Sequence, residues 1–410
     1  MAGPLSGIRV IDLSRVLAGP WAAQNLADLG AEVIKIERPG KGDDSRAFGP
    51  PWLKDDAGRD TTESAYFLSA NRGKKSITVD ISKPEGARIV RELATSADVL
   101  IENYKVGDLA RYGLGYEELA KLNPRLIYCS VTGFGQTGPY RDRAGYDFMV
   151  QGLGGLMSIN GERDDMPGGG PQRVGVPLVD IFTGMYASIA ICAALAHRAQ
   201  GGVAGRGQHI DMALLDSCMA LLANQGANYL ASGNIPGRVG NTHPNIVPYQ
   251  SFSTADGDII VAAGNDNLFR KYCDAAGCAA LADDPRFATN AARVENRAAL
   301  TALLAEVMHK RDTAGWVALL DAAGVPCGPI NNIAQAFDDP QVLARGMMIE
   351  VEHALGAKAP MVRSPMRFSA TQLAFDLAPP MLGQHTDEIL RQSLGRSDAV
   401  IAQLKAQGVI

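Results

Sequence analysis

Ile8-Arg-Val-Ile-Asp-Leu13, followed by residues 21–29 and then by Glu32-Val-Ile-Lys-Ile36, is the stretch of sequence that decides the fold. The first and last pieces are short runs rich in Ile and Val, typical of buried strands, and the middle piece has the length and pattern of a helix that Gly30 ends. A strand, a helix and a strand within about 30 residues form a βαβ unit, which requires a parallel sheet. We therefore expect an α/β protein.

The same alternation continues along the chain. We expect strands at 76–79, 98–101 and 126–131, with helices at 84–95 and 107–122 between them. No G-x-G-x-x-G motif follows the first strand, so a dinucleotide cofactor is not indicated. The large domain is thus predicted to be Rossmann-like in fold, and fold alone does not give the function.

The second half of the chain changes character twice. An apolar helix with small residues is expected at 177–198, buried against another backbone, and a strand at 209–214 passes into a helix that reaches about residue 230. A Gly-, Asn- and Pro-rich connector at 233–248 leads to a smaller α+β segment. There we expect a strand at 258–261 and helices at 267–276, 297–310 and 312–323, then antiparallel strand at 349–368 and a helix at 386–394.

Composition excludes several classes of protein. At 410 residues two lobes are expected, and a net charge of −5 gives no support for nucleic-acid binding. The six cysteines form no CxxC motif, so reduced thiols are expected rather than disulfides or a metal site. No secretory signal is found, and the apolar run at 187–196 stops at His197 before it reaches the ~20 residues of a membrane span. We expect a cytoplasmic protein without a membrane or nucleic-acid partner.

One carboxylate stands out as a candidate nucleophile. Asp180 lies in the run Val174-Gly-Val-Pro-Leu-Val-Asp180-Ile-Phe-Thr-Gly184, where Pro177 suits the first position of a helix. Asp180 then falls in the first turn, where unpaired amides and the helix dipole favour an ionised carboxylate. Such a carboxylate can attack an activated acyl group. On position alone, an Asp in a first turn is more often just a favourable charge.

The chain as a whole resembles the class III CoA-transferases, the family of formyl-CoA transferase. The resemblance runs in order from about residue 5 to the C-terminus, and its motifs are specific only in combination. They are Leu5-Ser-Gly-Ile-Arg-Val-Ile-Asp-Leu13, Ala18-Gly-Pro20, Leu29-Gly-Ala-Glu-Val-Ile-Lys-Ile-Glu-Arg38, Asn71-Arg-Gly-Lys-Lys-Ser-Ile-Thr-Val-Asp80, Ala97-Asp-Val-Leu-Ile-Glu-Asn103, Gly205-Arg-Gly-Gln-His-Ile-Asp211, Gly324-Val-Pro-Cys-Gly-Pro329 and Leu382-Gly-Gln-His-Thr386.

The resemblance implies an architecture. It predicts a Rossmann-like, CoA-binding large domain built from both chain ends (1–224 and 329–410) and a small α+β domain at 225–328, in an intertwined homodimer of ring-shaped subunits. It also implies that Asp180 is the catalytic aspartate: it attacks a donor thioester to give a mixed anhydride, and the CoA thiolate then forms an aspartyl-CoA thioester, which the acceptor carboxylate attacks. The CoA thioester is a substrate, and no bound cofactor or metal is implied.

The resemblance also implies a set of CoA contacts at the carboxyl edge of the sheet. Arg38, Lys74, Lys75 and Arg111 can meet phosphate oxygens, and Tyr104 or Tyr112 can stack on the adenine. The alternative for each Arg or Lys is a solvated surface charge. The full expected set is Val16, Arg38, Lys75, Val79, Asn103, Tyr104, Arg111 and Tyr112.

Three residues are expected to position the substrate: Leu17, Tyr146 and Asp147. Asp147 matches an acidic position of formyl-CoA transferase, but a helix N-cap before Phe148 is a competing role. Leu17 replaces a Gln of formyl-CoA transferase and the loop at 241–250 is short, which argues against formate and oxalate. The C-terminal half resembles the succinyl-CoA:glutarate CoA-transferases of the family more closely, which implies a dicarboxylate substrate.

Three questions stay open at this point. The distal carboxylate needs a partner, for which Arg72, His243 and Gln250 are candidates. An α-methylacyl-CoA racemase-like isomerase is one alternative function, although that chemistry uses a His where this chain has Tyr146, a poor base at neutral pH. A non-catalytic CoA-binding protein is the other alternative, which the presence of Asp180 disfavours.

Overall fold

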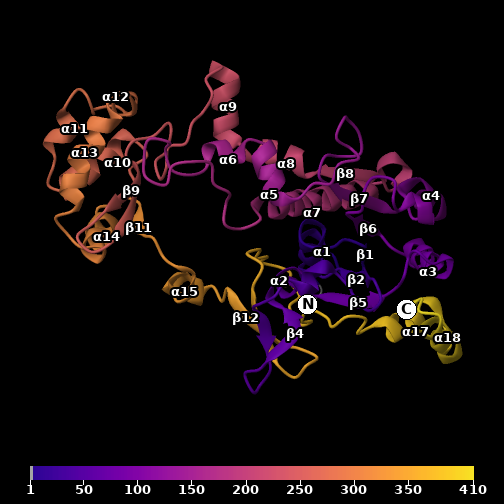
Figure 1. The fold of residues 1–410 in the computed structure, drawn as a ribbon. Helices are drawn as coiled ribbons and strands as arrows, with labels where there is room; N and C mark the ends of the chain where they lie inside the picture. The colour runs from indigo at the N-terminus through magenta and orange to yellow at the C-terminus, as the bar shows by residue number, and fades with distance from the viewer. Residues whose placement is uncertain (1–2) are drawn as a thin grey trace. The chain divides into compact units, whose positions relative to one another are not determined.

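The computed structural model describes residues 3–410, which divide into two compact units (Figure 1). The larger unit contains the chain up to Leu156, then Val174–Gly233 and Leu343–Ile410, and the smaller unit contains Met157–Arg173 and Asn234–Val342. The expected boundaries, 224/225 and 328/329, fall near the limits of these units but not at them. The sequence did not indicate that 157–173 belongs to the smaller unit.

A six-stranded parallel sheet forms the centre of the larger unit, as the first βαβ unit predicts. Its strand order is β5-β2-β1-β6-β7-β8, so the chain winds outward in one direction and then in the other from the β1–β6 pair. The strands are β1 (Arg9–Asp12), β2 (Glu32–Glu37), β5 (Lys74–Thr78), β6 (Val99–Glu102), β7 (Ile127–Thr132) and β8 (His209–Ala213). The α/β fold class and the expected strands of this sheet are confirmed.

Helices pack on both faces of this sheet because its strands are apolar on both sides. Ile11, Ile34 and Leu100 belong to one buried core. Their strand neighbours alternate to the opposite face, where α1 and α7 lie against the sheet and against each other. The helices of the first face are α3 (Pro84–Thr95), α4 (Tyr116–Leu122), α17 (Thr386–Leu394) and α18 (Asp398–Ala406).

Helix α7 (Leu178–Ala199) packs closely against α1 (Ala18–Asp28), as its small residues predict. A Cβ on Gly184 would lie 2.6 Å from the carbonyl oxygen of Ala18, so only glycine permits this approach. Pro177 is the N-cap rather than the first helical residue. With 22 residues, α7 is long and apolar enough to cross a membrane by length and composition, so the expectation that no run reaches that length was wrong. A core helix of a soluble protein passes the same test.

Glycines account for two helices that are shorter than expected. The region 107–122 forms only the short helix η2 (Ala110–Tyr112) and then α4, because Gly113 has a φ of +66°. The helix for which Asp147 was considered as an N-cap ends early: α5 (Asp147–Leu153) is separated from α6 (Leu156–Ile159), since Gly155 has a φ of +82°. A Cβ on Gly154 would lie 2.5 Å from the Sγ of Cys218, so the glycine at this position allows close packing against Cys218.

The other elements of the larger unit surround the sheet. β3 and β4 form an antiparallel pair that the sequence did not predict, and β12 and β13 form the antiparallel pair expected at 349–368. These elements are η1 (Asp44–Ala47), β3 (Trp52–Lys54), β4 (Asp60–Ser64), α2 (Ala65–Ala70), η3 (Gly202–Gly205), α8 (Leu214–Leu221), α9 (Ala223–Ser232), α16 (Pro340–Ala344, which straddles the unit limit), β12 (Met348–Glu352) and β13 (Lys358–Val362).

The smaller unit is α+β, as expected. Its three-stranded antiparallel sheet has the order β11-β10-β9 and packs on a core that includes Phe269, Tyr272 and Trp316. The elements are β9 (Tyr249–Ser253), β10 (Asp258–Ala262), α10 (Asp266–Ala275), α11 (Ala280–Asp283), α12 (Asn290–Glu295), α13 (Arg297–Met308), α14 (Thr313–Ala322), β11 (Cys327–Pro329) and α15 (Ile333–Phe337).

Candidate active site

Two neighbouring cavities lie at the carboxyl edge of the parallel sheet, where ligands of open α/β sheets bind. Their linings include residues that directly follow strands, namely Arg38 after β2, Val79 after β5 and Asn103 after β6, and also Val16 in the loop after β1. The strand order reverses between β1 and β6. The cavities meet at this reversal, which is the topological switch point of the sheet.

The first cavity, which we call the Asp180 cavity, has a volume of about 320 Å³. It brings together predicted residues from four separate parts of the chain. The predicted residues that line it are Val16, Leu17, Asn103, Tyr104, Tyr146 and Asp180. Leu17 is buried, whereas Tyr146 is largely exposed at the rim.

The second cavity, which we call the Arg38 cavity, has a volume of about 300 Å³. Three predicted residues line it that do not line the first one: Arg38, Val79 and Tyr112. Arg15, Asp44 and Tyr104 line both cavities. Because these residues are shared, the two cavities are neighbouring parts of one groove along the sheet edge, with Asp180 towards one end and Arg38 towards the other.

Asp147 caps the helix that carries Asp180. It is the first residue of α5, and its Oδ2 accepts hydrogen bonds from the amides of Val179 (2.8 Å) and Asp180 (3.2 Å) in the first turn of α7. Its Oδ1 accepts a hydrogen bond from Gln151 at 2.6 Å. The competing interpretation of Asp147 as a helix cap is therefore correct in kind, but the helix that it caps is α7 rather than its own.

This arrangement reverses one expectation about Asp180. The first-turn amides were expected to favour its ionised form, but the Asp147 carboxylate accepts them instead. Burial, and secondarily the negative charge of Asp147, raise the pKa of Asp180 to about 7. The amides at the start of α7 thus bind the carboxylate of Asp147, and the carboxylate of Asp180 is left without that stabilisation. A strongly shifted titratable group in a cleft is a mark of a functional site.

Val16 adopts a backbone conformation that a β-branched residue rarely tolerates. Its φ is +70°, in the left-handed region that favours glycine. Such a conformation costs about 1–3 kcal/mol and persists only where surrounding contacts impose it. Strain of this kind, in a residue that lines the Asp180 cavity, is typical of functional sites.

Three predicted phosphate contacts do not reach the groove. Lys75 lies near the amino end of β5, where its ammonium pairs with Glu32 at 3.4 Å and Glu388 at 3.1 Å. Lys74 is fully buried and pairs with Asp12. Arg111 is exposed and pairs with a neighbouring carboxylate rather than lining either cavity. Of the four cations predicted to meet phosphate oxygens, Arg38 is the one that lines the groove.

None of the three candidates for the partner of the distal carboxylate lines either cavity. Nε and Nη2 of Arg72 donate hydrogen bonds to the carboxylate of Asp28 at 2.8 and 2.6 Å, and this ion pair is buried. His243 and Gln250 belong to the smaller unit and line neither cavity. His243 accepts a hydrogen bond from the amide of Asn245, a structural role.

Sequence reasoning missed several residues of the groove. Arg15 lines both cavities and pairs with Asp44 at 2.9 Å. Arg143 lines the Asp180 cavity and stacks on Tyr140, with 4.5 Å between the guanidinium carbon and the ring centroid. Tyr66 lines neither cavity, but burial and the carboxylate of Asp180 raise its pKa to about 12. An Arg in a loop after a strand, as at Arg15, was the one signal that the sequence offered.

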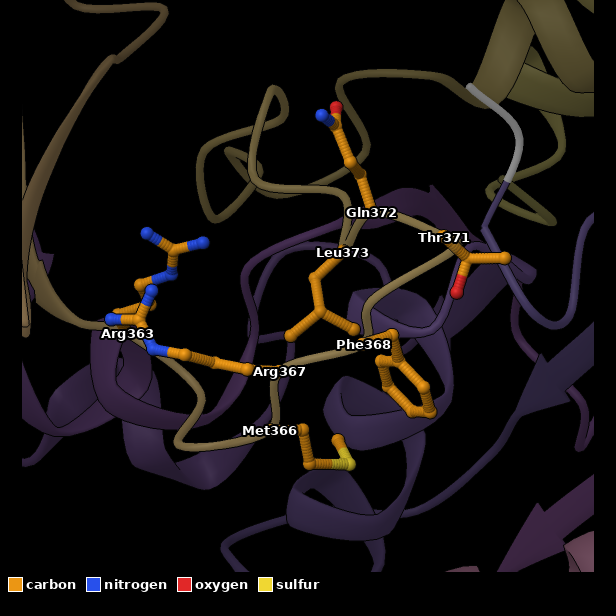
Figure 2. Close-up of a pocket in the computed structure, with 7 residues that line it drawn as sticks. All are labelled: Arg363, Met366, Arg367, Phe368, Thr371, Gln372 and Leu373. Atoms are coloured by element: carbon orange, nitrogen blue, oxygen red, sulfur yellow. The ribbon is translucent and has the colours of Figure 1, made fainter.

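A third cavity, of about 370 Å³, lies in the segment between β13 and α17 (Figure 2). Arg363, Arg367 and Phe368 are among the residues that line it, and its lining contains no carboxylate or thiol. The Nε of Arg363 has no hydrogen-bond partner in the described part of the chain. None of the predicted site residues lines this cavity, so we do not assign it to the active site.

A doubly wound parallel sheet, a groove across its switch point and a carboxylate with a raised pKa at a helix start are together typical of the active site of an α/β enzyme. The chain matches the family model of CoA-transferase family III over residues 5–386, so it belongs to this family and is a CoA-transferase. The resemblance noted in the sequence is thereby confirmed.

Known proteins of the family match nearly the whole chain. It is 51% identical over 389 residues to a succinate–glutarate CoA-transferase of Agrobacterium fabrum, covering 95% of each chain. It is 45% identical to the human succinyl-CoA:glutarate CoA-transferase, covering 99% of this chain and 90% of the human one. A crystal structure of a CAIB/BAIF family protein from Brucella suis matches with a TM-score of 0.83 and 51% identity, over 96% of this chain and 100% of that chain.

Proposed function

We propose that this enzyme moves CoA from succinyl-CoA to a dicarboxylic acid, with glutarate as the first candidate acceptor. The observation that carries the proposal is Asp180, a carboxylate with a raised pKa in a groove at the carboxyl edge of the sheet. The choice of substrates is supported by the two relatives that are named for succinate and glutarate. Formate and oxalate are not proposed as substrates.

The mechanism we propose uses Asp180 as the nucleophile. One of its oxygens attacks the thioester carbonyl of succinyl-CoA, and the C–S bond breaks to leave a succinyl-aspartyl anhydride and the CoA thiolate. The thiolate attacks the aspartyl carbonyl, and succinate leaves from an Asp180-CoA thioester. The carboxylate of glutarate then attacks this thioester, and the released thiolate attacks the glutaryl carbonyl to regenerate Asp180 and form glutaryl-CoA. Covalent catalysis splits one difficult transfer into easier steps.

The groove offers room for both ends of the CoA thioester. In this proposal the thioester occupies the Asp180 cavity and the nucleotide end extends into the Arg38 cavity, where an exposed guanidinium and the Tyr112 ring are available. A guanidinium forms charge-assisted hydrogen bonds with phosphate oxygens. Held in this way, the thiolate returns to the next carbonyl in an effectively intramolecular step.

Arg143 is our candidate for the partner of the distal carboxylate of the dicarboxylic acid. Within residues 3–410 no carboxylate lies within ion-pair distance of its guanidinium, which stacks on Tyr140 and on Phe134 (5.4 Å). Stacking fixes a guanidinium in place and leaves its edges free to bind a carboxylate. Arg141 lines the same cavity but pairs with Asp142 at 3.4 Å, so it is a matched control.

The test of the substrate proposal compares acceptors. With succinyl-CoA as the donor, kcat/KM for glutarate should exceed that for butyrate by at least about tenfold, because only glutarate has a second carboxylate that the Arg143 guanidinium can bind. Arg143→Gln should remove most of this preference, and Arg141→Gln should keep it. If butyrate serves as well as glutarate, the dicarboxylate assignment fails while the transferase assignment stands.

We also propose that the enzyme is an intertwined homodimer. Large apolar side chains on α7 and α8 are exposed in the single chain, among them Tyr186 (41%), Ile189 (59%) and Met219 (54%). Exposed apolar groups that gather on neighbouring helices mark interaction surfaces. Interlocked subunits separate only by unfolding, so mass photometry at nanomolar concentration should detect the dimer alone. A folded monomer under these conditions would refute this assembly. Localisation in the cytoplasm stays a prediction.

A further inference from the structure

The loop between β1 and α1 combines backbone strain with an unusually complete set of side-chain contacts. Its residues 15–17 line the Asp180 cavity, and Val16 has the left-handed φ of +70° described above. A strained loop persists only if other groups hold it. We therefore expect groups outside the loop to hold its backbone N–H and C=O groups in place.

Polar side chains from β1, from β2 and from the residue after β6 hold the first part of the loop. The amide of Ser14 donates to Asp12 at 2.9 Å, and its carbonyl accepts from the ammonium of Lys35 at 2.9 Å. The Asn103 side chain binds both backbone groups of Arg15: its Oδ1 accepts from the amide (2.9 Å) and its Nδ2 donates to the carbonyl (2.7 Å). Asn103, predicted as a CoA contact, thus acts on the loop as well.

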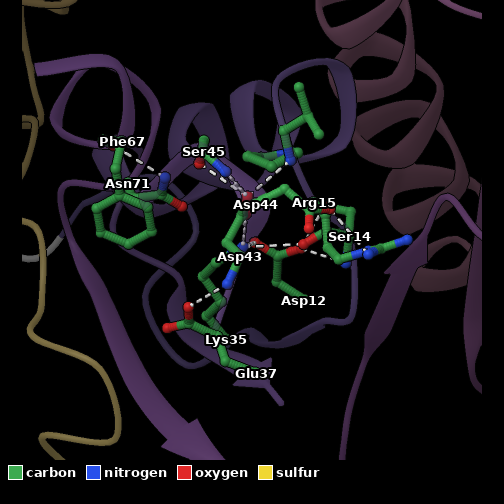
Figure 3. A network of polar contacts seen from close by, with 12 residues as sticks. Asp12, Ser14, Arg15, Lys35, Glu37, Asp43, Asp44, Ser45, Phe67 and Asn71 are labelled. Carbon is green, nitrogen blue, oxygen red and sulfur yellow. Dashed lines mark hydrogen bonds and ion pairs between the residues drawn. The ribbon is translucent and has the colours of Figure 1, made fainter. Parts of the chain in front are cut away.

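Asp43 holds the strained residue itself. Its Oδ1 accepts hydrogen bonds from the amide of Val16 (3.0 Å) and from the amide and hydroxyl of Ser45 (2.9 and 2.7 Å). Its Oδ2 lies 2.8 Å from the Nζ of Lys35. Lys35 therefore links Ser14 and Val16, because it contacts the carbonyl of one and the carboxylate that holds the amide of the other (Figure 3).

These charges are buried, where ions are costly unless they are paired. The side chains of Lys35, Asp43, Asp12 and Lys74 are fully buried, and Lys74 pairs with Asp12 at 2.8 Å. Although burial opposes both shifts, the pairing raises the pKa of Lys35 and holds the pKa of Asp43 well below its usual range. In other proteins, replacing a buried ion pair by apolar residues of similar volume is often neutral for stability. The network is thus better explained by what it positions.

We propose that the Lys35–Asp43 pair is a positioning device that holds Val16 in its left-handed conformation and so fixes the wall of the Asp180 cavity that faces the acyl-CoA. Lys35 and Asp43 are positioning residues, since they act through the loop. The inference rests on the proposed function for its catalytic consequence, but the restraint of the loop is a property of the protein alone.

The test is a double-mutant cycle between Asp43→Asn and Val16→Gly, with two readouts. Glycine adopts a positive φ without strain, so the loop then needs its anchor less. Asp43→Asn should lower kcat with succinyl-CoA and glutarate by about 10- to 100-fold in the wild-type background and by less than about threefold in the Val16→Gly background. Hydrogen–deuterium exchange of a peptide that spans residues 13–18 should accelerate in the first case and much less in the second.

Asp28→Asn is the matched control. Asp28 is as buried as Asp43 and pairs with Arg72 at 2.6 Å, but it lies at the other end of α1, about 15 Å along the helix axis from Ala18. It should lower the melting temperature without changing exchange at 13–18, and its effect should be equal in both backgrounds. If Asp43→Asn does not fold, Asp43→Glu takes its place in the cycle, since it keeps a negative charge beside Lys35 but moves the carboxylate relative to the amide of Val16.

Equal losses of kcat and equal acceleration of exchange in both backgrounds would overturn the proposal, because the pair would then serve stability only. An enzyme with no transfer from succinyl-CoA would refute the proposed function instead. In that case the exchange cycle alone still decides whether Asp43 holds the loop.

Discussion

Asp43 and Asp180 lie at the same edge of the sheet in opposite electrostatic surroundings. Asp43 contacts an ammonium and several hydrogen-bond donors, which lower its pKa. The main neighbour of Asp180 is another carboxylate, Asp147, which also accepts the amide of Asp180 itself, and the pKa of Asp180 is raised. One carboxylate is fully compensated, and the other is not.

The difference separates two uses of a carboxylate, the one fully buried and the other half-buried. A compensated carboxylate is inert and fixes the backbone to which it bonds, as Asp43 fixes Val16. An uncompensated carboxylate keeps its reactivity, because no hydrogen bond or cation in the described chain lowers the energy of its lone pairs. Residues that violate the usual rules of burial are expected at functional sites.

The largest effect should come from removing the reactive carboxylate. Asp180→Asn should lower kcat by at least about 10⁴-fold, the size of loss found when a covalent nucleophile is removed. Asp216→Asn is the matched control, since Asp216 is likewise in the first turn of a helix, α8. It should keep near wild-type activity in the same succinyl-CoA assay. Activity of Asp180→Asn above a few per cent would end the nucleophile assignment.

The second prediction concerns the negative charge of Asp147, which distinguishes the surroundings of Asp180 from those of Asp43. Asp180 must be ionised to attack, and its pKa is about 7, so kcat/KM should rise with pH through that value. Asp147→Asn removes a negative neighbour and lowers the pKa of Asp180. The acid limb of the profile should therefore move down by about one pH unit, about a fivefold gain at pH 6 relative to the maximum.

Glu102→Gln is the control for this profile. Burial raises the pKa of Glu102 to about 7 as well, but this carboxylate lines neither cavity. Its removal should leave the acid limb in place. If Glu102→Gln moves the limb and Asp147→Asn does not, the limb belongs to another group and the like-charge account of Asp180 is wrong.

The third prediction tests which cations serve the groove. Arg38→Gln should raise KM for succinyl-CoA about fivefold, the value of one partly exposed charge-assisted contact. Lys75→Gln should leave KM within about twofold, because Lys75 pairs with Glu32 and Glu388 away from the cavities. Initial-rate kinetics on the two variants decide between them. An equal rise for both would return Lys75 to the CoA site.

The smallest effect concerns stability. The pKa of Asp180 in the folded protein, about 7, lies above its ordinary value of 3.8, so the folded state binds the proton more tightly. Proton binding to Asp180 therefore stabilises the folded protein at low pH. This stabilisation is lost, and the free energy of unfolding falls, as pH rises from about 4 to 7. Asp180→Asn removes that loss, and should be more stable than wild type by about 1 kcal/mol at pH 8 and by less at pH 5. Urea denaturation at the two pH values measures the difference; equal stabilities at both would contradict the raised pKa.

The sequence predicted what depends on local pattern. The βαβ unit at 8–36 and the helix at 84–95 follow from apolar periodicity and from the position of a proline, and both were found where expected. Asp180 was singled out from its helix-start motif together with the family resemblance; it does lie in the first turn of α7, and its role as the nucleophile is our proposal. These features are readable because each is encoded within one short segment.

What the sequence could not predict depends on contacts between distant segments. Asp147 caps a helix that begins 31 residues later, so no local rule reveals it. Lys74 and Lys75 are adjacent in sequence, yet one is fully buried and the other is not, a difference that their shared motif does not reveal. The strain at Val16 depends on a carboxylate 27 residues away. Each case requires the assembled sheet edge.

The most direct test of the central claim is to follow oxygen from the acceptor into the nucleophile. In the proposed sequence of steps, an oxygen of glutarate stays on the Asp180 carboxyl group when glutaryl-CoA forms. Turnover of succinyl-CoA with ¹⁸O-labelled glutarate, followed by mass spectrometry of the peptide that contains Asp180, should therefore find ¹⁸O in that residue. Label in the released succinate but none in Asp180 would mean direct attack of glutarate on succinyl-CoA, and would contradict the account.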